Sequence, residues 1–290
     1  TCRTGIIQQV PYLPRHMAKN ATNKIVLDRK SDELRDIEVK LDFTPNALAS
    51  VLYKQGDTIV LISVTKADSL PRWFPRNSQK GWINAEYSLL PGSTNSRFRR
   101  ERNGAKGRTM EIERLIARSL RGVIDLEELG PIAITVDCDI LNADGGTRCA
   151  SITAANIGLR LAIQRLISSG ECIPSKYRKS KEEMNNGQAI PNISEDDKKA
   201  HEMAVMKYDV AAISVGLLDG EIALDLDYIL DSNADVDMNV VGTSDGMLVE
   251  VQGTGEEATF SRLQLDKLMD TADIGLKKLH EVQSNCLKFE

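Results

Sequence analysis

The pattern of apolar and polar positions changes twice between residues 132 and 169. From Ile132 to Leu141 the residues are mostly β-branched and apolar, which predicts a buried strand. Residues 142–146 have the composition of a turn. A helix is then predicted to run from Thr147 to about Ser169, because apolar residues recur three or four positions apart, at Ile152, Ala155, Leu159, Ile163 and Leu166. A strand therefore leads through a glycine-containing turn directly into a helix.

Similar patterns predict more strands and helices on both sides of this unit. Alternating or apolar runs predict strands over 37–43, 49–53, 58–64, 83–90, 210–217, 221–228, 235–241 and 248–252. Helical spacing predicts helices over 109–120 and 263–282. No repeat of 20–50 residues is present and no linker separates two cores. We therefore expect one α/β (or α+β) domain over residues 24–290.

Two segments do not fit this periodic pattern. Residues 1–23 show no clear period, which predicts an N-terminal extension, and Met17 is a candidate for the true start. Residues 171–207 are polar and charged, with prolines and runs of lysine and glutamate. This composition predicts a mobile insertion without a catalytic role.

Composition limits the possible classes of protein. The 290 residues carry a net charge of −5, so the protein as a whole repels nucleic acid, and any RNA or phosphate site must come from local basic clusters. No apolar run reaches the roughly 18 residues of a membrane span, and no signal peptide is recognisable. The five cysteines are scattered without a C-x-x-C pair, which disfavours a disulfide framework or zinc site and fits the reducing cytoplasm.

The turn before the helix at Thr147 is a candidate anion site. Its glycines let a ligand approach the backbone, and the first N–H groups of the helix have no internal partner and carry partial positive charge. Arg148 adds a full charge, so residues Gly146, Thr147 and Arg148 are typical of phosphate binding. Arg108 stands at the start of the helix over 109–120 and repeats this arrangement. The alternative is a tight turn with a solvated arginine.

A basic stretch precedes Arg108. Residues 97–108 contain six basic side chains and one acidic one, so Arg97, Arg99 and Arg100 are candidate RNA contacts. The alternative is a solvated charged loop. Residues 71–81 interleave arginine and lysine with Trp73 and Phe74, which is typical either of single-stranded RNA binding or of aromatics that cover the core.

An acidic segment supplies the candidate catalytic groups. Residues 219–237 contain seven acidic side chains and no basic one. We expect Asp231, Asp235 and Asp237 to converge, because the last two are two positions apart on a predicted strand. Such oxygen ligands suit Mg²⁺ or Mn²⁺, and mutual repulsion can keep one carboxyl protonated as a general acid. The three histidines lie in no comparable context, and the alternative for the aspartates is a solvated strand edge.

Taken together, five stretches resemble the ribonuclease PH family of phosphorolytic exoribonucleases. They match in order and spacing over about residues 28–282, apart from the insertion. The stretches are Gly81–Pro91 (GWINAEYSLLP), Gly107–Arg121 (GRTMEIERLIARSLR), Asp137–Thr153 (DCDILNADGGTRCASIT), Asp231–Val241 (DSNADVDMNVV) and Val249–Glu256 (VEVQGTGE).

The resemblance implies a fold and an activity. The fold is the ribosomal-protein-S5-domain-2-like type, in which mixed β-sheets pack with helices and contain βαβ units. The implied activity removes 3′-terminal nucleotides from RNA, such as transfer-RNA precursors, as nucleoside diphosphates, with inorganic phosphate as co-substrate and Mg²⁺ or Mn²⁺ as cofactor. The implied assembly is a homohexamer built as a trimer of dimers.

The resemblance also implies residue roles. Phosphate binding falls on Arg108, Gly146, Thr147 and Arg148, and RNA binding on the basic loop. Metal binding and acid catalysis fall on Asp231, Asp235 and Asp237.

Four departures from the family pattern leave these positions intact. Gly92 replaces a usual arginine, Glu33 replaces a usual glycine, the loop before Arg108 is short, and the insertion at 171–207 is long. Two other functions remain open at this point. One is a catalytically silent RNA-binding subunit of an exosome-like ring, and the other is a hydrolytic nuclease with the same metal site.

Overall fold

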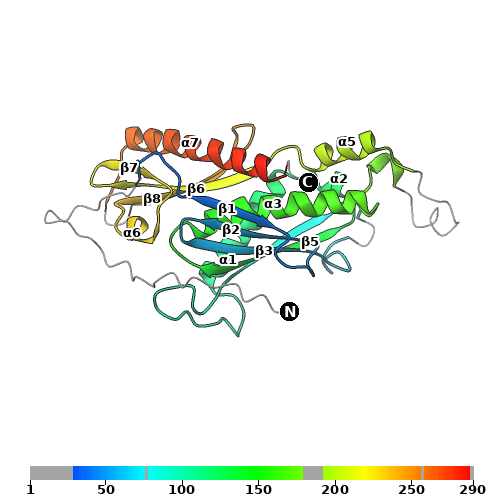
Figure 1. The fold of residues 1–290 in the computed structure, drawn as a ribbon, viewed down its shortest axis with the longest axis horizontal. Coiled ribbons are helices and arrows are strands. Elements are labelled where there is room, and N and C mark those ends of the chain that lie inside the picture. The colour runs from blue at the N-terminus through cyan, green and yellow to red at the C-terminus, as the bar shows by residue number, and fades with distance from the viewer. Residues whose placement is uncertain (1–28, 76–77, 179–191, 256–257, 288–290) are drawn as a thin grey trace, which may run out of the picture.

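Two β-sheets form the frame of the protein. The computed structural model describes residues 29–75, 78–178, 192–255 and 258–287 (Figure 1). The first sheet has five strands in the order β1 (Ile37–Leu41), β2 (Ala49–Gln55), β3 (Thr58–Lys66), β5 (Ala133–Asn142) and β4 (Trp82–Leu89). The second has four in the order β7 (Glu221–Leu224), β6 (Val210–Leu218), β8 (Val236–Thr243) and β9 (Leu248–Gly255).

The first sheet is mixed. β4 pairs parallel to β5, whereas the other neighbouring strands pair antiparallel. The parallel pair is joined through α1 (Gly107–Gly122) and the short helix α2 (Leu126–Leu129), which makes a βαβ unit. The predicted α/β class with mixed sheets is therefore confirmed.

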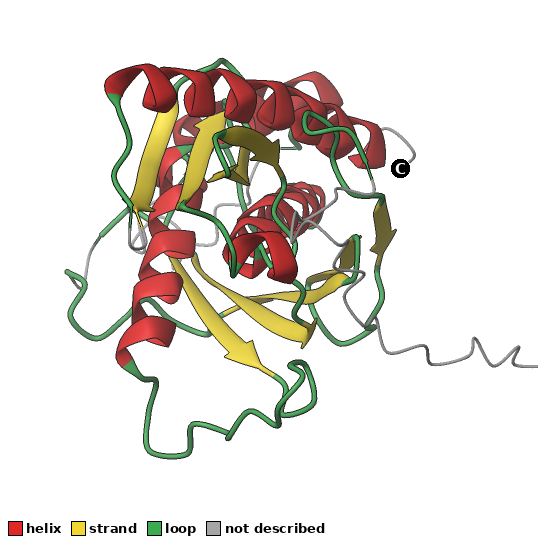
Figure 2. Ribbon diagram, turned by 90° about the vertical axis from the view of Figure 1, so that its left-hand side faces the viewer, coloured by secondary structure: helices red, strands yellow, loops and turns green. Residues whose placement is uncertain are grey.

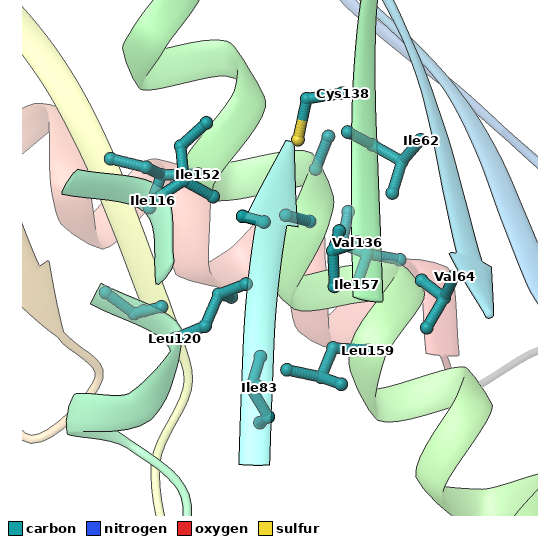
Figure 3. Packing of buried hydrophobic residues seen from close by; sticks show 14 of the residues in the cluster. Ile62, Val64, Ile83, Ile116, Leu120, Val136, Cys138, Ile152, Ile157 and Leu159 are labelled. Carbon is teal, nitrogen blue, oxygen red and sulfur yellow. The ribbon is translucent and has the colours of Figure 1, made fainter. Parts of the chain in front are cut away.

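Helix α3 (Thr147–Ser168) lies in the centre of the core. It contacts β2 and β3 of the first sheet and β6 of the second, so its residues are apolar or small on nearly every side. Ile152, Ile157 and Leu159 join the cluster that contains Ile62 and Val136 (Figure 3). The first residues of the helix are half-buried, and the residues from Cys149 to Leu159 are all buried.

Helix α7 (Arg262–Cys286) covers the other face of the second sheet (Figures 1 and 2). Ser261 caps its start through a capping box with Gln264. Leu268, Ala272 and Leu276 pack against Ile213 of β6 in a second apolar cluster. No helix in the part of the chain that the structure describes is long and apolar enough to cross a membrane.

The structure corrects the prediction for the insertion. Residues 179–191 lie outside the described residues, but α5 (Glu195–Val205) is a regular helix whose start is capped by the Ser194 hydroxyl, 3.1 Å from the backbone N of Asp197. His201 and Val205 are one turn apart and are buried. Glu202 also bonds to Arg160 and Gln164 of α3, so contacts distant in sequence dock a helix of polar composition.

A second correction concerns the predicted strand over 221–228. β7 ends at Leu224, and Asp225 has a left-handed φ of 58°, which breaks the alternation. The chain then enters the short helix α6 (Tyr228–Asp231), capped by Asp227. The predicted N-terminal extension, residues 1–23, lies outside the described residues.

Buried His201 predicts that acid destabilises this part of the fold. Burial lowers the pKa of His201, although the carboxylate of Glu128 opposes this effect, and the charge of Arg178 adds to it. Its Nε2 lies 3.4 Å from the Cys172 Sγ. The unfolded chain then binds a proton at about pH 6.5 that the folded chain excludes, so stability is present above this pH and is lost as pH falls below it. We expect Tm to fall less between pH 8 and pH 5.5 in His201→Gln than in the parent, and equal pH slopes would contradict this.

Candidate active site

The turn between β5 and α3 has a backbone that only glycine allows. Gly145 and Gly146 have φ values of 72° and 60°, both in the left-handed region. A Cβ on Gly145 would lie 2.5 Å from the backbone carbon of Asp227, so no side chain fits there. Residues 144–146, called the phosphate loop below, thus pass closely under another backbone segment and lead to the first turn of α3.

Two arginines and two hydroxyls meet beside the first turn of α3. The hydroxyl of Tyr87 on β4 lies 2.9 Å from the Thr147 Oγ1. Burial raises the pKa of Tyr87, while the hydrogen bond to Thr147 and the positive charges of Arg108 and Arg148 oppose that rise. Both arginines are therefore close enough to act on one hydroxyl. The charges of Arg108 on α1 and Arg148 on α3 thus act on the same hydroxyl of β4.

The two arginines differ in how they are held. Arg148 donates from Nη1 to the Gln252 Oε1 at 2.9 Å and lies 3.6 Å from the Glu111 Oε1. Arg108 is exposed and makes no ion pair or hydrogen bond to a described residue. Tyr87, Gln252 and Glu111 were not singled out from the sequence, although each lies in one of the motifs that carry the family resemblance. One arginine is fixed and the other is free to close on an anion.

The three predicted carboxylates lie on different parts of the second sheet and its connections. Asp235 accepts a hydrogen bond from the backbone N of Asp219 at 3.0 Å, which orients its Oδ2 towards the β6–β7 turn. Asp231 ends α6, and Asp237 lies on β8. Over the described ranges, no three His, Cys, Asp or Glu side chains are arranged to hold a metal ion. The expected metal site formed by all three carboxylates is therefore not found among the described residues.

Asp237 nevertheless lies on β8, the strand whose Asn239 contacts the first turns of α3. It shares a face of β8 with Asn239, whose Oδ1 accepts from the Cys149 Sγ at 3.1 Å. Asn239 is in register with Gln252, the partner of Arg148. Asp237 lies two residues, about 7 Å of strand, from Asn239. Its Oδ1 is buried and has no hydrogen-bond partner in the described part of the chain.

The basic residues lie on the loop between β4 and α1, which runs out beyond the ends of both elements (Figure 2). Arg97, Arg99 and Arg100 are exposed. Burial raises the pKa of Asp139 on β5, and the charge of Arg100 opposes this rise. Glu101 accepts from the backbone N of Lys106 at 3.0 Å and so fixes the base of the loop.

The aromatic residues of the 71–81 loop have a packing role. Trp73 packs edge-on against Trp82 and Phe74 packs against it at a tilt, with ring centroids 4.9 and 5.8 Å away. The Arg121 guanidinium lies 4.3 Å from the centre of the Trp82 ring. This arrangement favours the core-covering interpretation for Phe74 and Trp82. Trp73 alone stays largely exposed, at 66%.

Comparison with known proteins identifies the class. Models of the 3′ exoribonuclease family match residues 33–163 as domain 1 and residues 210–275 as domain 2. The chain belongs to this 3′ exoribonuclease family. It is 46% identical over 256 residues to the ribonuclease PH of Rhodopirellula baltica, covering 88% of this chain and 94% of that protein. It is 43% identical over 259 residues to the ribonuclease PH of Crocosphaera subtropica, covering 89% and 95%. The predicted resemblance is confirmed.

Solved structures share the fold. Rice (Oryza sativa) Rrp46 superposes with a TM-score of 0.64 at 18% identity, over 90% of this chain and 98% of that one. An Archaeoglobus fulgidus exosome with RNA bound to the active site gives 0.64 at 20% identity, over 90% and 91%. An archaeal exosome core gives 0.62 at 20% identity, over 88% and 89%.

Proposed function

We propose that this chain is a phosphorolytic 3′→5′ exoribonuclease, which catalyses RNA(n) + phosphate ⇌ RNA(n−1) + nucleoside diphosphate. The observation that carries this assignment is the start of α3, where Arg148 is held by Gln252 and the Thr147 hydroxyl bonds to Tyr87, a residue on which the charge of Arg108 also acts. The ribonuclease PH relatives, which match almost end to end, support the same activity.

The phosphate loop and the two arginines bind inorganic phosphate. The N–H groups at the start of α3 donate to its oxygens, and Arg148 and Arg108 neutralise its charge. This neutralisation is needed because a dianion must approach the phosphodiester, which is also an anion. Positioning of the two groups supplies most of the rate gain in such transfers.

The carboxylates serve the leaving group. A buried carboxylate oxygen without a hydrogen bond, such as Asp237 Oδ1, is a group that a cation satisfies. Mg²⁺ commonly takes one or two protein carboxylates together with substrate phosphate, so Asp237 with Asp231 or Asp235 would hold it without a third protein ligand. When bound, Mg²⁺ or Mn²⁺ supplies charge stabilisation at the scissile phosphate. The remaining carboxyl, Asp231 or Asp235, protonates the leaving 3′ oxygen.

The basic loop holds the RNA. Arg97, Arg99 and Arg100 are exposed and contact the backbone of the 3′ tail, which gives little sequence preference. We propose precursors of transfer RNA as substrates, a homohexamer of three dimers as the assembly, and the cytoplasm as the location. The described cysteines Cys138, Cys149, Cys172 and Cys286 are free thiols, which suits a reducing compartment.

A second candidate is a catalytically silent ring subunit. The fold shared with exosome subunits favours it, but such a chain needs neither the paired arginines nor the orphaned Asp237 oxygen. A hydrolytic nuclease would likewise have no use for two arginines beside a helix start. The phosphorolytic enzyme accounts for both sets of residues.

Product analysis tests the proposal. A short single-stranded RNA labelled in its 3′-terminal nucleotide is incubated with the protein and Mg²⁺, with and without inorganic phosphate. We expect nucleoside diphosphate only when phosphate is present. Release of nucleoside monophosphate without phosphate would indicate hydrolysis, and RNA binding without release would indicate the silent subunit.

A further inference from the structure

A buried ion pair lies behind the phosphate loop. Arg35, in the segment before β1, donates from Nη2 to the Asp225 Oδ1 at 2.7 Å, and its backbone N donates to the Oδ2 at 2.8 Å. The side chains are 7% and 1% exposed. Burial alone would raise the pKa of Asp225, but the charge and hydrogen bonds of Arg35 outweigh it and the pKa is lowered. Because buried ion pairs seldom stabilise a fold more than apolar packing does, this pair needs another explanation.

Arg35 also binds the backbone of the phosphate loop. Its Nη1 donates to the backbone O of Asp144 at 2.6 Å, and a Cβ on Gly146 would lie 3.2 Å from its Nη2. From the other side, the Thr58 Oγ1 on β3 donates to the O of Gly145 at 2.7 Å and accepts from the N of Asp144 at 3.1 Å. The backbone of the loop is therefore fixed from β3 and from the segment before β1.

The contacts of the phosphate loop extend to α6, the short helix that carries Asp231. The side chain of Asp144 accepts a hydrogen bond from the backbone of Tyr228, the first residue of α6. Gly145 packs directly on the backbone of Leu226 and Asp227. Asp231 stands at the other end of the same short helix. Arg35 and Asp225 thus join the loop that binds phosphate to the helix that bears Asp231.

We propose that Arg35, Asp225 and Thr58 are positioning residues that hold the phosphate loop in its anion-binding shape, so that they set the affinity for inorganic phosphate. This inference rests on the proposed function. None of the three touches phosphate in this arrangement. They act through the carbonyls of Asp144 and Gly145, whose orientation determines that of the N–H groups which follow.

Substitutions at Thr58 give the cleanest test, because valine keeps the shape and loses the hydroxyl, whereas serine keeps the hydroxyl. We expect Thr58→Val to raise KM for phosphate about tenfold or more, with KM for RNA unchanged. Thr58→Ser should restore most of the affinity. Arg35→Lys keeps a charge opposite Asp225 but cannot reach both partners, so it should also raise KM for phosphate.

A matched control separates positioning from loss of stability. Arg160 pairs with Asp209 at 2.9 Å and, like Arg35, is largely buried, with 14% of its side chain exposed. It contacts none of the proposed site residues in the described part of the chain. Arg160→Lys should lower Tm without changing KM for phosphate. Equal phosphate KM in Thr58→Val, Thr58→Ser and the parent would overturn the proposal, as would an equal rise in KM for phosphate and RNA.

A binding measurement distinguishes this failure from failure of the proposed function. Phosphate should raise the Tm of the parent, and the rise should be smaller in Thr58→Val and Arg35→Lys. If the parent binds phosphate in this way but releases no nucleoside diphosphate, the proposed reaction is wrong while the positioning role stands. If phosphate changes no Tm in the parent, the role of the loop falls as well.

Discussion

Replacing Arg148 with alanine is expected to lower kcat/KM for phosphate by about 10²–10³-fold, by analogy with the loss of one donor from an oxyanion hole. Arg148 is held by Gln252 and lies near Glu111, so its guanidinium is already placed before phosphate arrives. Its loss removes both charge and orientation at the start of α3. Steady-state rates over a range of phosphate concentrations measure the effect, and Mg²⁺ and RNA are kept saturating.

Arg118→Ala provides the control for a general loss of surface charge. Arg118 lies on α1, is 53% exposed, and pairs with Glu250, the neighbour of Gln252 two residues along β9. Surface pairs of this kind contribute little, so its phosphate KM should stay near that of the parent. If Arg148→Ala kept near-normal phosphorolysis, or if both variants lost activity equally, the assignment of the phosphate site would be wrong.

The sequence predicted the parts of the fold in which local pattern and tertiary environment agree. The strand over 132–141 and the helix from Thr147 were found almost to the residue because β5 and α3 carry long, regular patterns of apolar residues. The prediction failed where a few long-range contacts determine the secondary structure. α5 is docked by buried His201 and Val205 and by bonds from Glu202 to α3. The alternation after Leu224 is broken by Asp225, which has a left-handed φ and a carboxylate held by Arg35.

The candidate site divides in the same way. The glycines and the two helix starts indicate an anion site through local chemistry. Arg108, Gly146, Thr147 and Arg148 could therefore be selected from the sequence directly. Tyr87, Gln252 and Arg35 could not, because their contacts depend on register between elements far apart in the chain; Arg35 and Asp225 are separated by 190 positions. For the carboxylates, spacing along the chain suggested a metal site of three aspartates, whereas no three His, Cys, Asp or Glu side chains among the described residues are arranged to hold a metal ion.

Replacing Asp237 with asparagine should separate activity from stability. The Oδ1 of Asp237 is buried without a hydrogen-bond partner, which is costly for a charged group and is the mark of a residue kept for function. A neutral amide of the same shape relieves that cost, so Tm should stay equal or rise. We expect kcat to fall by about 10²–10⁴-fold, the range for loss of a group that acts on the leaving oxygen.

The effect on phosphate binding should differ from that of Arg148→Ala. Because Asp237 serves the leaving group and not the nucleophile, its loss should change kcat while the phosphate-induced rise in Tm stays as in the parent. Asp245→Asn is the matched control, since Asp245 lies in the turn after β8 with its carboxylate hydrogen-bonded to Thr243. A fall in Tm with unchanged kcat in Asp237→Asn would make Asp237 a structural residue. A smaller phosphate-induced rise in Tm in Asp237→Asn would instead place Asp237 in the phosphate site. The assignment of phosphate binding to the start of α3 and of leaving-group chemistry to β8 would then be wrong.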